Sequence, residues 1–334
     1  MNFILSNLPE AISCRNILLG LQKRFARGLE AFDESDKCLH MWFRNKGKNG
    51  GGERLNFPAA NHLMSASINV SQVHYQKPEN KNISSATALS SIIHPLHPIM
   101  PSLHMHISLM TKFDNRYYWR IMADLNPSIP NREDTDVFND MLRKIAPNYV
   151  DKSFEVGNKY FYIPALDRCR GVSHFYLENH KTDNFDEDLR FAELFGMHVI
   201  TTYLGIINSK KNNLKPVISN EKNIQLAYHT LYFFQVLLLD RGTTVGLLSH
   251  NENDLGILSS LPKFIDKNLL LSWVSRLLSP QDLLIERLIK VMPNTGVIEI
   301  NTTLKNIFAT IIREFYLEYP NAKEMQAESP IYKK

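Results

Sequence analysis

The sequence predicts an α+β fold in which helices cover a large antiparallel sheet. Segments rich in β-branched and aromatic residues gather in the middle of the chain. Amphipathic helical patterns flank these segments, without the regular strand–helix alternation that is typical of parallel sheets. At 334 residues, the chain is long enough to bury a substantial core.

The period of the apolar residues locates the individual elements. Leu18, Leu21 and Phe25 recur at helical spacing and predict a helix over residues 10–32. Further helices are predicted over residues 134–146, 186–206, 281–292 and 302–317. Strands are predicted over residues 66–74, 104–110, 117–122, 159–163, 172–177 and 231–239. The stretch 46–54, which reads KGKNGGGER, is predicted to be a flexible loop, and it lacks the GxxxxGKS or GxxxxGKT pattern that binds phosphates.

Composition and charge narrow the class of protein. The net charge of +4 is too small and too evenly spread to favour nucleic acid as a partner. The three cysteines, Cys14, Cys38 and Cys169, show no CxxC spacing, so we expect free thiols in a reducing compartment. We expect neither a signal peptide nor a membrane span, because no apolar run approaches 18 residues. A cytoplasmic location is therefore predicted.

Residues 94–106, HPLHPIMPSLHMH, form the densest histidine cluster. From His104 onward, polar and apolar residues alternate, so His104, His106 and Ser108 are expected on one face of a strand whose other face enters the core. A metal site with a His-x-His pair normally adds a glutamate and a third histidine, and no glutamate follows within a few residues. An acid–base role is favoured over a metal site, although metal binding near His94, His104 and His106 stays open.

A second dense stretch is LLLDRGTTVGL, residues 237–247. An apolar strand is expected to carry Asp240 and Arg241 at its end. One interpretation is an exposed turn. The other is a carboxylate that accepts N–H donors, beside a guanidinium that binds an anionic group of a substrate.

Six segments follow one another in the order known from one enzyme family. They read GGG at 50–52, SINVSQVH at 67–74, HPLHPIMPSLH at 94–104, DLNP at 124–127, YFY at 160–162 with RG at 170–171, and DRGTTVGL at 240–247 with LP at 261–262. Together they resemble the oxygen-dependent coproporphyrinogen III oxidase family, from about residue 40 to residue 265.

The resemblance implies a large, fairly flat antiparallel sheet between two layers of helices, and a homodimer. It also implies oxidative decarboxylation of coproporphyrinogen III to protoporphyrinogen IX, with dioxygen as co-substrate and no organic or metal cofactor. His104 would be the acid–base residue, Asp240 the acceptor of pyrrole N–H groups, and Arg241 the partner of a propionate. The substrate-binding residues would be Ser90, His94, His106, Ser108 and Arg170.

Several positions depart from the family pattern. The asparagine and arginine that follow the active-site histidine are His106 and Ser108 here, and the glycine run before residue 124 reads RIM. Each lost arginine removes charge-assisted hydrogen bonds worth roughly 1.5–3 kcal/mol apiece. A second hypothesis therefore stands beside the oxidase: a catalytically silent homologue that binds a tetrapyrrole or a protein partner.

We expect one domain over residues 1–280, with a helical extension over 281–334 packed on it. The apolar stretch 269–274, with Leu277 and Leu278, must be buried against another part of the protein or a second subunit. A symmetric homodimer formed through residues 240–280 would bury this stretch between the subunits. Alternatively, the C-terminal helices of the same chain cover this stretch.

Overall fold

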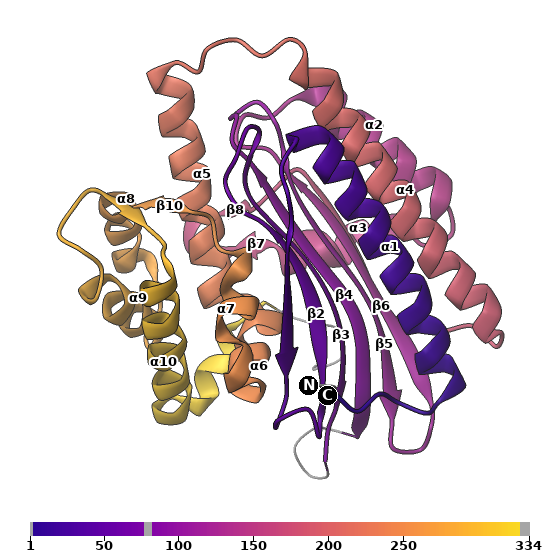
Figure 1. The fold of residues 1–334 in the computed structure, drawn as a ribbon. Helices are drawn as coiled ribbons and strands as arrows, with labels where there is room; N and C mark the ends of the chain where they lie inside the picture. Colours follow the sequence, from indigo (N-terminus) through magenta and orange to yellow (C-terminus); the bar gives the residue numbers. More distant parts are fainter. Residues whose placement is uncertain (1–2, 77–81, 328–334) are drawn as a thin grey trace. The chain divides into compact units, whose positions relative to one another are not determined.

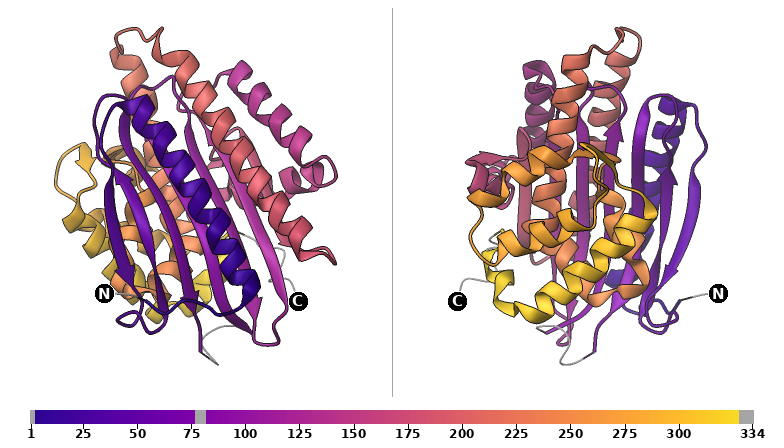
Figure 2. Two further views of the ribbon diagram at one scale, coloured as in Figure 1. Left: turned by 45° about the vertical axis from the view of Figure 1, so that its right-hand side comes forward. Right: turned by 90° about the vertical axis from the view of Figure 1, so that its left-hand side faces the viewer.

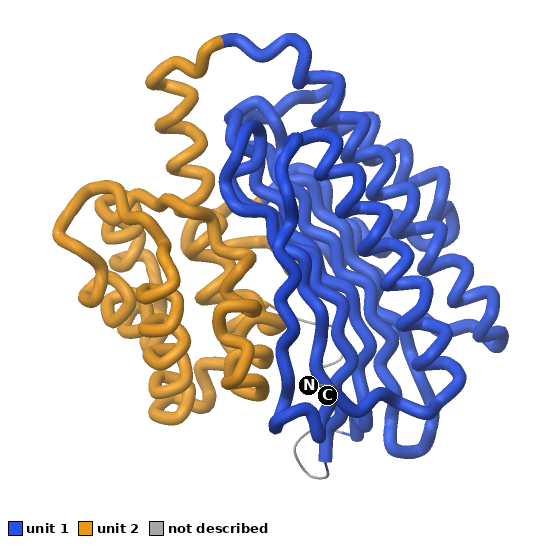
Figure 3. Tube along the Cα trace, viewed as in Figure 1, with its two compact units in different colours: residues 1–158, 171–215, 333–334 blue, residues 159–170, 216–332 orange. Residues whose placement is uncertain are grey.

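The computed structural model describes residues 3–76 and 82–327. Within these residues the backbone divides into two compact units (Figure 3). The first unit holds the chain up to residue 158 together with 171–215, and the second holds 159–170 together with the chain from residue 216. The division into a domain over 1–280 and an extension from 281 stays a prediction.

The first unit is built on a seven-stranded sheet with the strand order β1-β2-β3-β4-β5-β6-β9 (Figure 1). All six neighbouring pairs are antiparallel. The strands are β1 (Cys38–Phe43), β2 (Gly50–Phe57), β3 (Leu63–His74), β4 (Ile83–Pro95), β5 (Ser102–Lys112), β6 (Tyr117–Asn126) and β9 (Ser173–His180). The α+β class with a large antiparallel sheet is confirmed.

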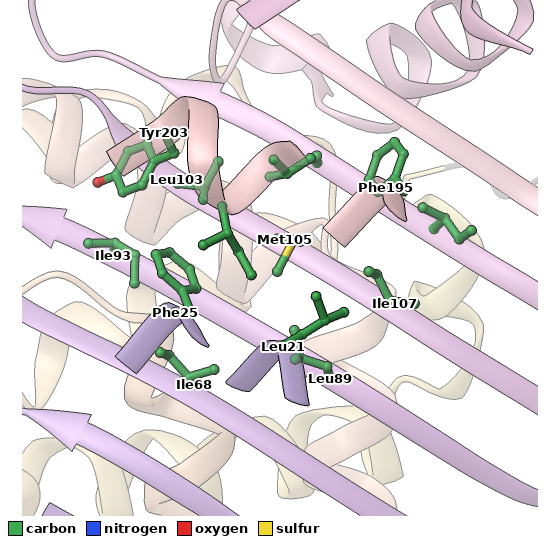
Figure 4. Close-up of a cluster of buried hydrophobic side chains, with 14 of the residues drawn as sticks. Leu21, Phe25, Ile68, Leu89, Ile93, Leu103, Met105, Ile107, Phe195 and Tyr203 are labelled. Atoms are coloured by element: carbon green, nitrogen blue, oxygen red, sulfur yellow. The ribbon is translucent and has the colours of Figure 1, made fainter. Parts of the chain in front are cut away.

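Helices cover one face of this sheet (Figure 2). Those of the first unit are α1 (Pro9–Asp33), α2 (Arg132–Ile145) and α4 (Phe185–Lys211), and α3 (Val150–Tyr160) begins in it. Phe25 of α1 and Tyr203 of α4 pack edge to face in the same cluster as Met105 of β5, and all three are fully buried (Figure 4). Burying side chains of this size stabilises the fold by about 1.5–3 kcal/mol each.

Local signals begin these helices where the sequence predicts them. Pro9 occupies the first turn of α1, where its missing N–H costs nothing. The side chains of Asn131 and Asn184 accept hydrogen bonds from the first backbone N–H groups of α2 and α4. The predicted helices over 10–32, 134–146 and 186–206 are confirmed, as are the strands over 66–74, 104–110, 117–122 and 172–177 apart from their ends.

The second unit is mainly helical. Its helices are α5 (Ser219–Leu238), α6 (Arg241–Ser249), α7 (Asp254–Ile257), α8 (Lys267–Ser272), α9 (Gln281–Lys290) and α10 (Thr302–Glu318). Two small antiparallel sheets join β7 (Tyr162–Ile163) to β8 (Arg168–Cys169) and β10 (Phe264–Asp266) to β11 (Val297–Glu299). The predicted helices over 281–292 and 302–317 are confirmed as α9 and α10.

The predicted strand over 231–239 is wrong, because these residues belong to helix α5. Every residue from Tyr228 to Leu238 is buried. A helix that is buried all round shows no amphipathic period, and its aromatic content imitates that of a buried strand. Asp240 therefore stands at a helix–helix junction and not at the end of a strand.

Two further predictions need correction. The predicted strand over 159–163 is the end of α3 followed by the two residues of β7. The predicted loop 46–54 is a turn only up to Asn49, because Gly50 begins strand β2. A Cβ on Gly52 would lie 2.5 Å from Nε1 of Trp42. The glycine at this position thus makes room for the indole of Trp42 on the neighbouring strand and is not a sign of a loop.

In the part of the chain that the structure describes, no single helix has the length and apolar composition needed to cross a membrane. Helices α5 and α6 meet these criteria only when taken together, and the pair is bent by 56°. Phe233 and Phe234 of α5 contact the rings of Phe308 and Trp273. These contacts are those of a helix in a protein core.

Candidate functional site

The face of the sheet opposite α1 and α4 carries a row of polar side chains, which we call the polar face. Successive residues of a strand point to opposite sides, so the core residue Met105 separates two side chains of this face. The strand register places Ser90 across from His106, and Ser108 across from Arg120. We define the polar face by Arg54, Asn69, Ser90, His104, His106, Ser108, Arg120, Asp124, Tyr176 and Glu178.

His104 and Asp124 form a close pair on neighbouring strands. Nδ1 of His104 lies 2.6 Å from Oδ1 of Asp124, whose side chain is fully buried, whereas the His104 side chain is 23% exposed. The Nδ2 group of Asn126 donates to Oδ2 of Asp124 at 2.5 Å. A carboxylate held in this way keeps the Nδ1 proton on the imidazole, so Nε2 is the nitrogen that exchanges a proton.

His106 lies between two serines. Its Nδ1 is 2.7 Å from Oγ of Ser90, and its Nε2 is 3.0 Å from Oγ of Ser108. Burial lowers the pKa of His106 to about 3, and the charges of Arg120 and His104 add to this effect. The ring is therefore neutral at physiological pH, and both of its nitrogens take part in one hydrogen-bonded chain.

Arg120 is held by a carboxylate of the same face. Its Nε and Nη2 groups donate to Oε1 of Glu178 at 3.0 and 2.7 Å. The hydroxyl of Tyr176 donates to the other oxygen, Oε2. These three residues form a compact network on β6 and β9.

Arg54 is a second guanidinium on the polar face. It is 7% exposed, and burial lowers its pKa. The register runs from Arg54 through Asn69 and Ser90 to His106 across four strands. At about 4.8 Å per strand, Arg54 lies roughly 14 Å along this row from His106.

Asp240 and Arg241 belong to the second unit, where Asp240 caps helix α6. Its Oδ2 accepts hydrogen bonds from the backbone N–H and the hydroxyl of Thr243 at 2.8 and 2.6 Å, and its Oδ1 accepts one from the hydroxyl of Tyr160. A carboxylate offers about four acceptor positions. One position therefore remains for a further donor. Arg241 is the first residue of α6 and is partly exposed.

Arg170 is buried within the second unit and is 3% exposed. Its guanidinium lies 4.3 Å from the ring centroid of Phe161 and 4.6 Å from that of Tyr232. Its Nη1 group donates to Oε1 of Gln235 at 2.7 Å. These contacts stabilise the packing of the unit. The predicted substrate-binding role of Arg170 stays a prediction.

The structure thus brings together half of the predicted site residues. Ser90, His104, His106 and Ser108 lie on adjacent strands of the polar face. His94 is fully buried near the end of β4, where its Nδ1 is 3.0 Å from Oγ of Ser102. The other three predicted residues, Asp240, Arg241 and Arg170, belong to the second unit.

Sequence reasoning missed several residues of the polar face. Asp124 entered only as part of a motif, although the alternation of residues 120–124 places Arg120 and Asp124 on one face. Tyr176 and Glu178 follow the same period on β9. Arg54 was missed because its glycine-rich segment is typical of loops, so the segment was not predicted to be a strand. The period-2 pattern of GERLNF was the signal that could have revealed it.

Across residues 3–76 and 82–327, no three His, Cys, Asp or Glu side chains are grouped so that they could hold a metal ion. The cofactor requirement stays a prediction. The arrangement offers a carboxylate-held imidazole for proton transfer, a neutral imidazole between two hydroxyls, and the guanidinium of Arg54, whereas that of Arg120 is paired with Glu178. These groups are suited to acid–base chemistry beside an anionic ligand.

Comparison with known protein families identifies the chain. The sequence model described as coproporphyrinogen III oxidase matches residues 13–274. The matched region contains the whole sheet of the first unit and every predicted site residue. It also covers well over half of the 334 residues. The chain therefore belongs to the coproporphyrinogen III oxidase family.

Proposed function

We propose that this protein uses dioxygen to convert two propionates of coproporphyrinogen III to vinyl groups, which gives protoporphyrinogen IX. Membership of an oxidase family of porphyrin biosynthesis supports the class of reaction. The observation that carries the proposal is the His104–Asp124 pair on the polar face. It supplies a held imidazole for proton transfer at a carbon that water cannot deprotonate unaided.

The reaction at each propionate is a two-electron oxidation. One C–H bond and the bond to the carboxylate carbon break, a C=C bond forms, and carbon dioxide and a proton leave. The two electrons pass to dioxygen, which takes up two protons and becomes hydrogen peroxide. The two electrons come from the bonds that break, and the electron-rich pyrrole beside the propionate passes them on to dioxygen. The residues of the protein must therefore bind and orient the substrate and move protons.

The residues then take the following roles. Nε2 of His104 takes the proton from the propionate side chain, while Asp124 fixes the ring. Within the second unit, the remaining acceptor position of Asp240 suits a pyrrole N–H, and the role of Arg241 as the partner of a propionate stays a prediction. Arg54 is a further partner for a propionate, because a buried guanidinium gains more from a carboxylate than a solvated one does.

The deciding assay adds air to coproporphyrinogen prepared anaerobically and measures the fluorescence of protoporphyrin after oxidation of the products. We expect turnover above the protein-free blank. We also expect its loss in His104→Ala and its retention in His198→Ala, a control at an exposed position of α4. Absence of turnover by folded wild-type protein would remove the oxidase proposal.

A second function, tetrapyrrole binding without turnover, is favoured by one specific observation. Arg120 is bound to Glu178 and Arg170 is stacked between two rings, so two guanidiniums are engaged within the protein. Fewer cations are then offered to a substrate with four carboxylates. Saturable binding of oxidised coproporphyrin, together with no turnover, would establish this function instead. If no porphyrin binds, a protein partner is the remaining form of this hypothesis.

A further inference from the structure

The last described residues of the chain fold back onto the junction between helices α5 and α6, where the yellow end of the chain lies beside α6 (Figure 1). The short 3₁₀ helix Pro320–Met325 leads to this position after α10. We call residues 325–327 the C-terminal strap. The strap and its partners at the junction all belong to the second unit.

The C-terminal strap holds the junction on both sides of Asp240. The backbone N–H of Ala327 donates to the carbonyl of Leu239 at 3.0 Å. Leu239 ends α5, and the last carbonyls of a helix have no partner within the helix. On the other side, Nε2 of Gln326 donates to Oγ1 of Thr244 at 2.6 Å. One partner of the strap thus directly precedes Asp240 in the sequence, and the other follows it within α6.

The side chain of Gln326 makes its contacts away from water. Its Nε2 group donates to the hydroxyl of Tyr316 at 2.8 Å as well as to Thr244. All three residues are buried. Because an amide offers two N–H donors, both donors of Gln326 are used. Separating a buried donor from its acceptor costs free energy, so these contacts hold α6 at a fixed distance from the strap.

The orientation of the Asp240 carboxylate depends on the backbone that the strap holds. Its Oδ2 accepts from the N–H and the hydroxyl of Thr243, and its Oδ1 accepts from the hydroxyl of Tyr160. The backbone N–H of Thr244 donates to the carbonyl of Asp240 at 3.2 Å. A displacement of α6 at Thr244 would therefore move Thr243 and, with it, the remaining acceptor position of Asp240.

We propose that Gln326 is a positioning residue, which holds Asp240 in the orientation that accepts a pyrrole N–H of the substrate. Gln326 acts through Thr244 and the backbone of the junction, and it does not touch the substrate. This inference rests on the proposed function, in which a tetrapyrrole with four carboxylates is bound. It extends the site to residues that lie beyond the region matched by the family model, which ends at residue 274.

The test is a double-mutant cycle on the dissociation constant of oxidised coproporphyrin III, measured by fluorescence titration. This porphyrin keeps the four carboxylates of the substrate and has pyrrole N–H groups. Asp240→Asn should weaken binding about tenfold, because asparagine still caps α6 but offers one acceptor oxygen in place of two. Gln326→Met keeps the length of the side chain without its N–H donors, and it should weaken binding about fivefold.

The double variant distinguishes positioning from simple stabilisation. If Gln326 acts through Asp240, the double variant should bind within about twofold of Asp240→Asn alone. If Gln326 only stabilises the fold, the two losses should multiply to about fiftyfold, and this result would overturn the inference. Wild-type affinity in folded Gln326→Met or in Asp240→Asn would overturn it as well.

Thr230→Val is the matched control in the same unit. The hydroxyl of Thr230 donates to the carbonyl of Leu226 and accepts from the backbone N–H of Asp266, both at 2.8 Å. Valine therefore also loses two hydrogen bonds, at a position roughly two turns before the end of α5. The control should lower the melting temperature but keep the dissociation constant within about twofold of wild type. A loss of affinity equal to that of Gln326→Met would contradict a role specific to the strap.

Ala327→Pro covers the case in which Gln326→Met does not fold. Proline has no N–H, so the hydrogen bond to Leu239 is lost while the side chain of Gln326 is kept. Gln326 has a φ of −75° and a ψ of 167°, a conformation that a following proline permits. We expect weaker coproporphyrin binding in this variant, with no further loss when Asp240→Asn is added. Unchanged affinity in folded Ala327→Pro would overturn the inference.

The outcomes separate this inference from the proposed function. If wild-type protein turns over coproporphyrinogen and the two losses multiply, the positioning role is overturned and the oxidase stands. If wild-type protein binds coproporphyrin without turnover and the losses do not multiply, the oxidase is overturned and the positioning role stands on a binding protein. If wild-type protein shows neither binding nor turnover, both are overturned.

Discussion

The imidazole of His104 donates from Nδ1 to a carboxylate oxygen of Asp124 at 2.6 Å, across the paired strands β5 and β6. Asp124 is fully buried, so its orientation is fixed by the sheet. The pair therefore anchors the ring through Nδ1 and assigns proton exchange to Nε2. The same division of roles underlies histidine bases in other enzymes, where the carboxylate selects the tautomer.

Asp124→Asn should lower kcat on coproporphyrinogen by roughly 10²–10⁴, with a much smaller change in KM, because the amide no longer selects the Nδ1–H tautomer. Steady-state kinetics with folded protein measures both constants. Asp114→Asn is the matched control, because Asp114 pairs with Arg116 in an exposed turn. A variant at position 124 that keeps the wild-type kcat would show that this carboxylate does not orient the catalytic histidine.

His106 should make the protein less stable in acid. Its pKa in the folded chain is about 3, below the ordinary value of 6.5. As the pH falls below 6.5, the unfolded chain takes up the proton first. Stability that is present above pH 6.5 is therefore lost between 6.5 and 3, by up to about 1.4 kcal/mol per pH unit.

Urea denaturation at several pH values between 4 and 7 measures this slope. His106→Asn should flatten it relative to wild type, although the variant loses stability at neutral pH through its altered contacts with Ser90 and Ser108. His198→Asn should keep the wild-type slope. Parallel pH dependences for wild type and His106→Asn would contradict the lowered pKa.

Arg313 should stabilise the segment that carries Asp240, although it lies beyond the region matched by the family. Its Nε donates to the carbonyl of Leu247 at 2.8 Å, and its Nη groups form a fork with Asp254. Arg313→Ala should lower the free energy of unfolding by about 1–3 kcal/mol. Arg116→Ala, at an exposed ion pair, should lower it by at most about 1 kcal/mol. If both variants lose the same free energy of unfolding in urea denaturation, the fork stabilises the protein no more than an exposed ion pair does.

Substitutions at exposed apolar residues can test the predicted homodimer. Leu270 is fully buried within the chain, whereas Leu271 is 53% and Leu278 is 75% exposed. Exposed side chains of this size are candidates for a subunit interface. Leu271→Asp with Leu278→Asp should convert a particle of about twice 38.5 kDa into one near 38.5 kDa in light scattering. Leu270→Asp should instead unfold the protein. A wild-type mass near 38.5 kDa would remove the dimer.

The sequence alone determined the faces of the strands. Alternation is a local property, so the spacing of His104, His106 and Ser108 is enough to place them together on one face. Helices with one apolar stripe, such as α1 and α4, could also be predicted from the sequence. The ordered motifs indicated the family and, with it, the antiparallel sheet. Helix α5 was misread because uniform burial erases the period on which such predictions depend.

Only the tertiary structure decided which polar side chains meet. Asp124 joins His104 through the register of strands β5 and β6, whereas Glu178 joins Arg120 where the pairing of β6 with β9 shifts its register between Trp119 and Ile121. Their separations of 20 and 58 residues along the chain carry no local signal. Register is set by the packing of the opposite, apolar face, since a shift by one residue would turn every side chain to the wrong side. The core beneath α1 and α4 thus fixes the chemistry of the polar face.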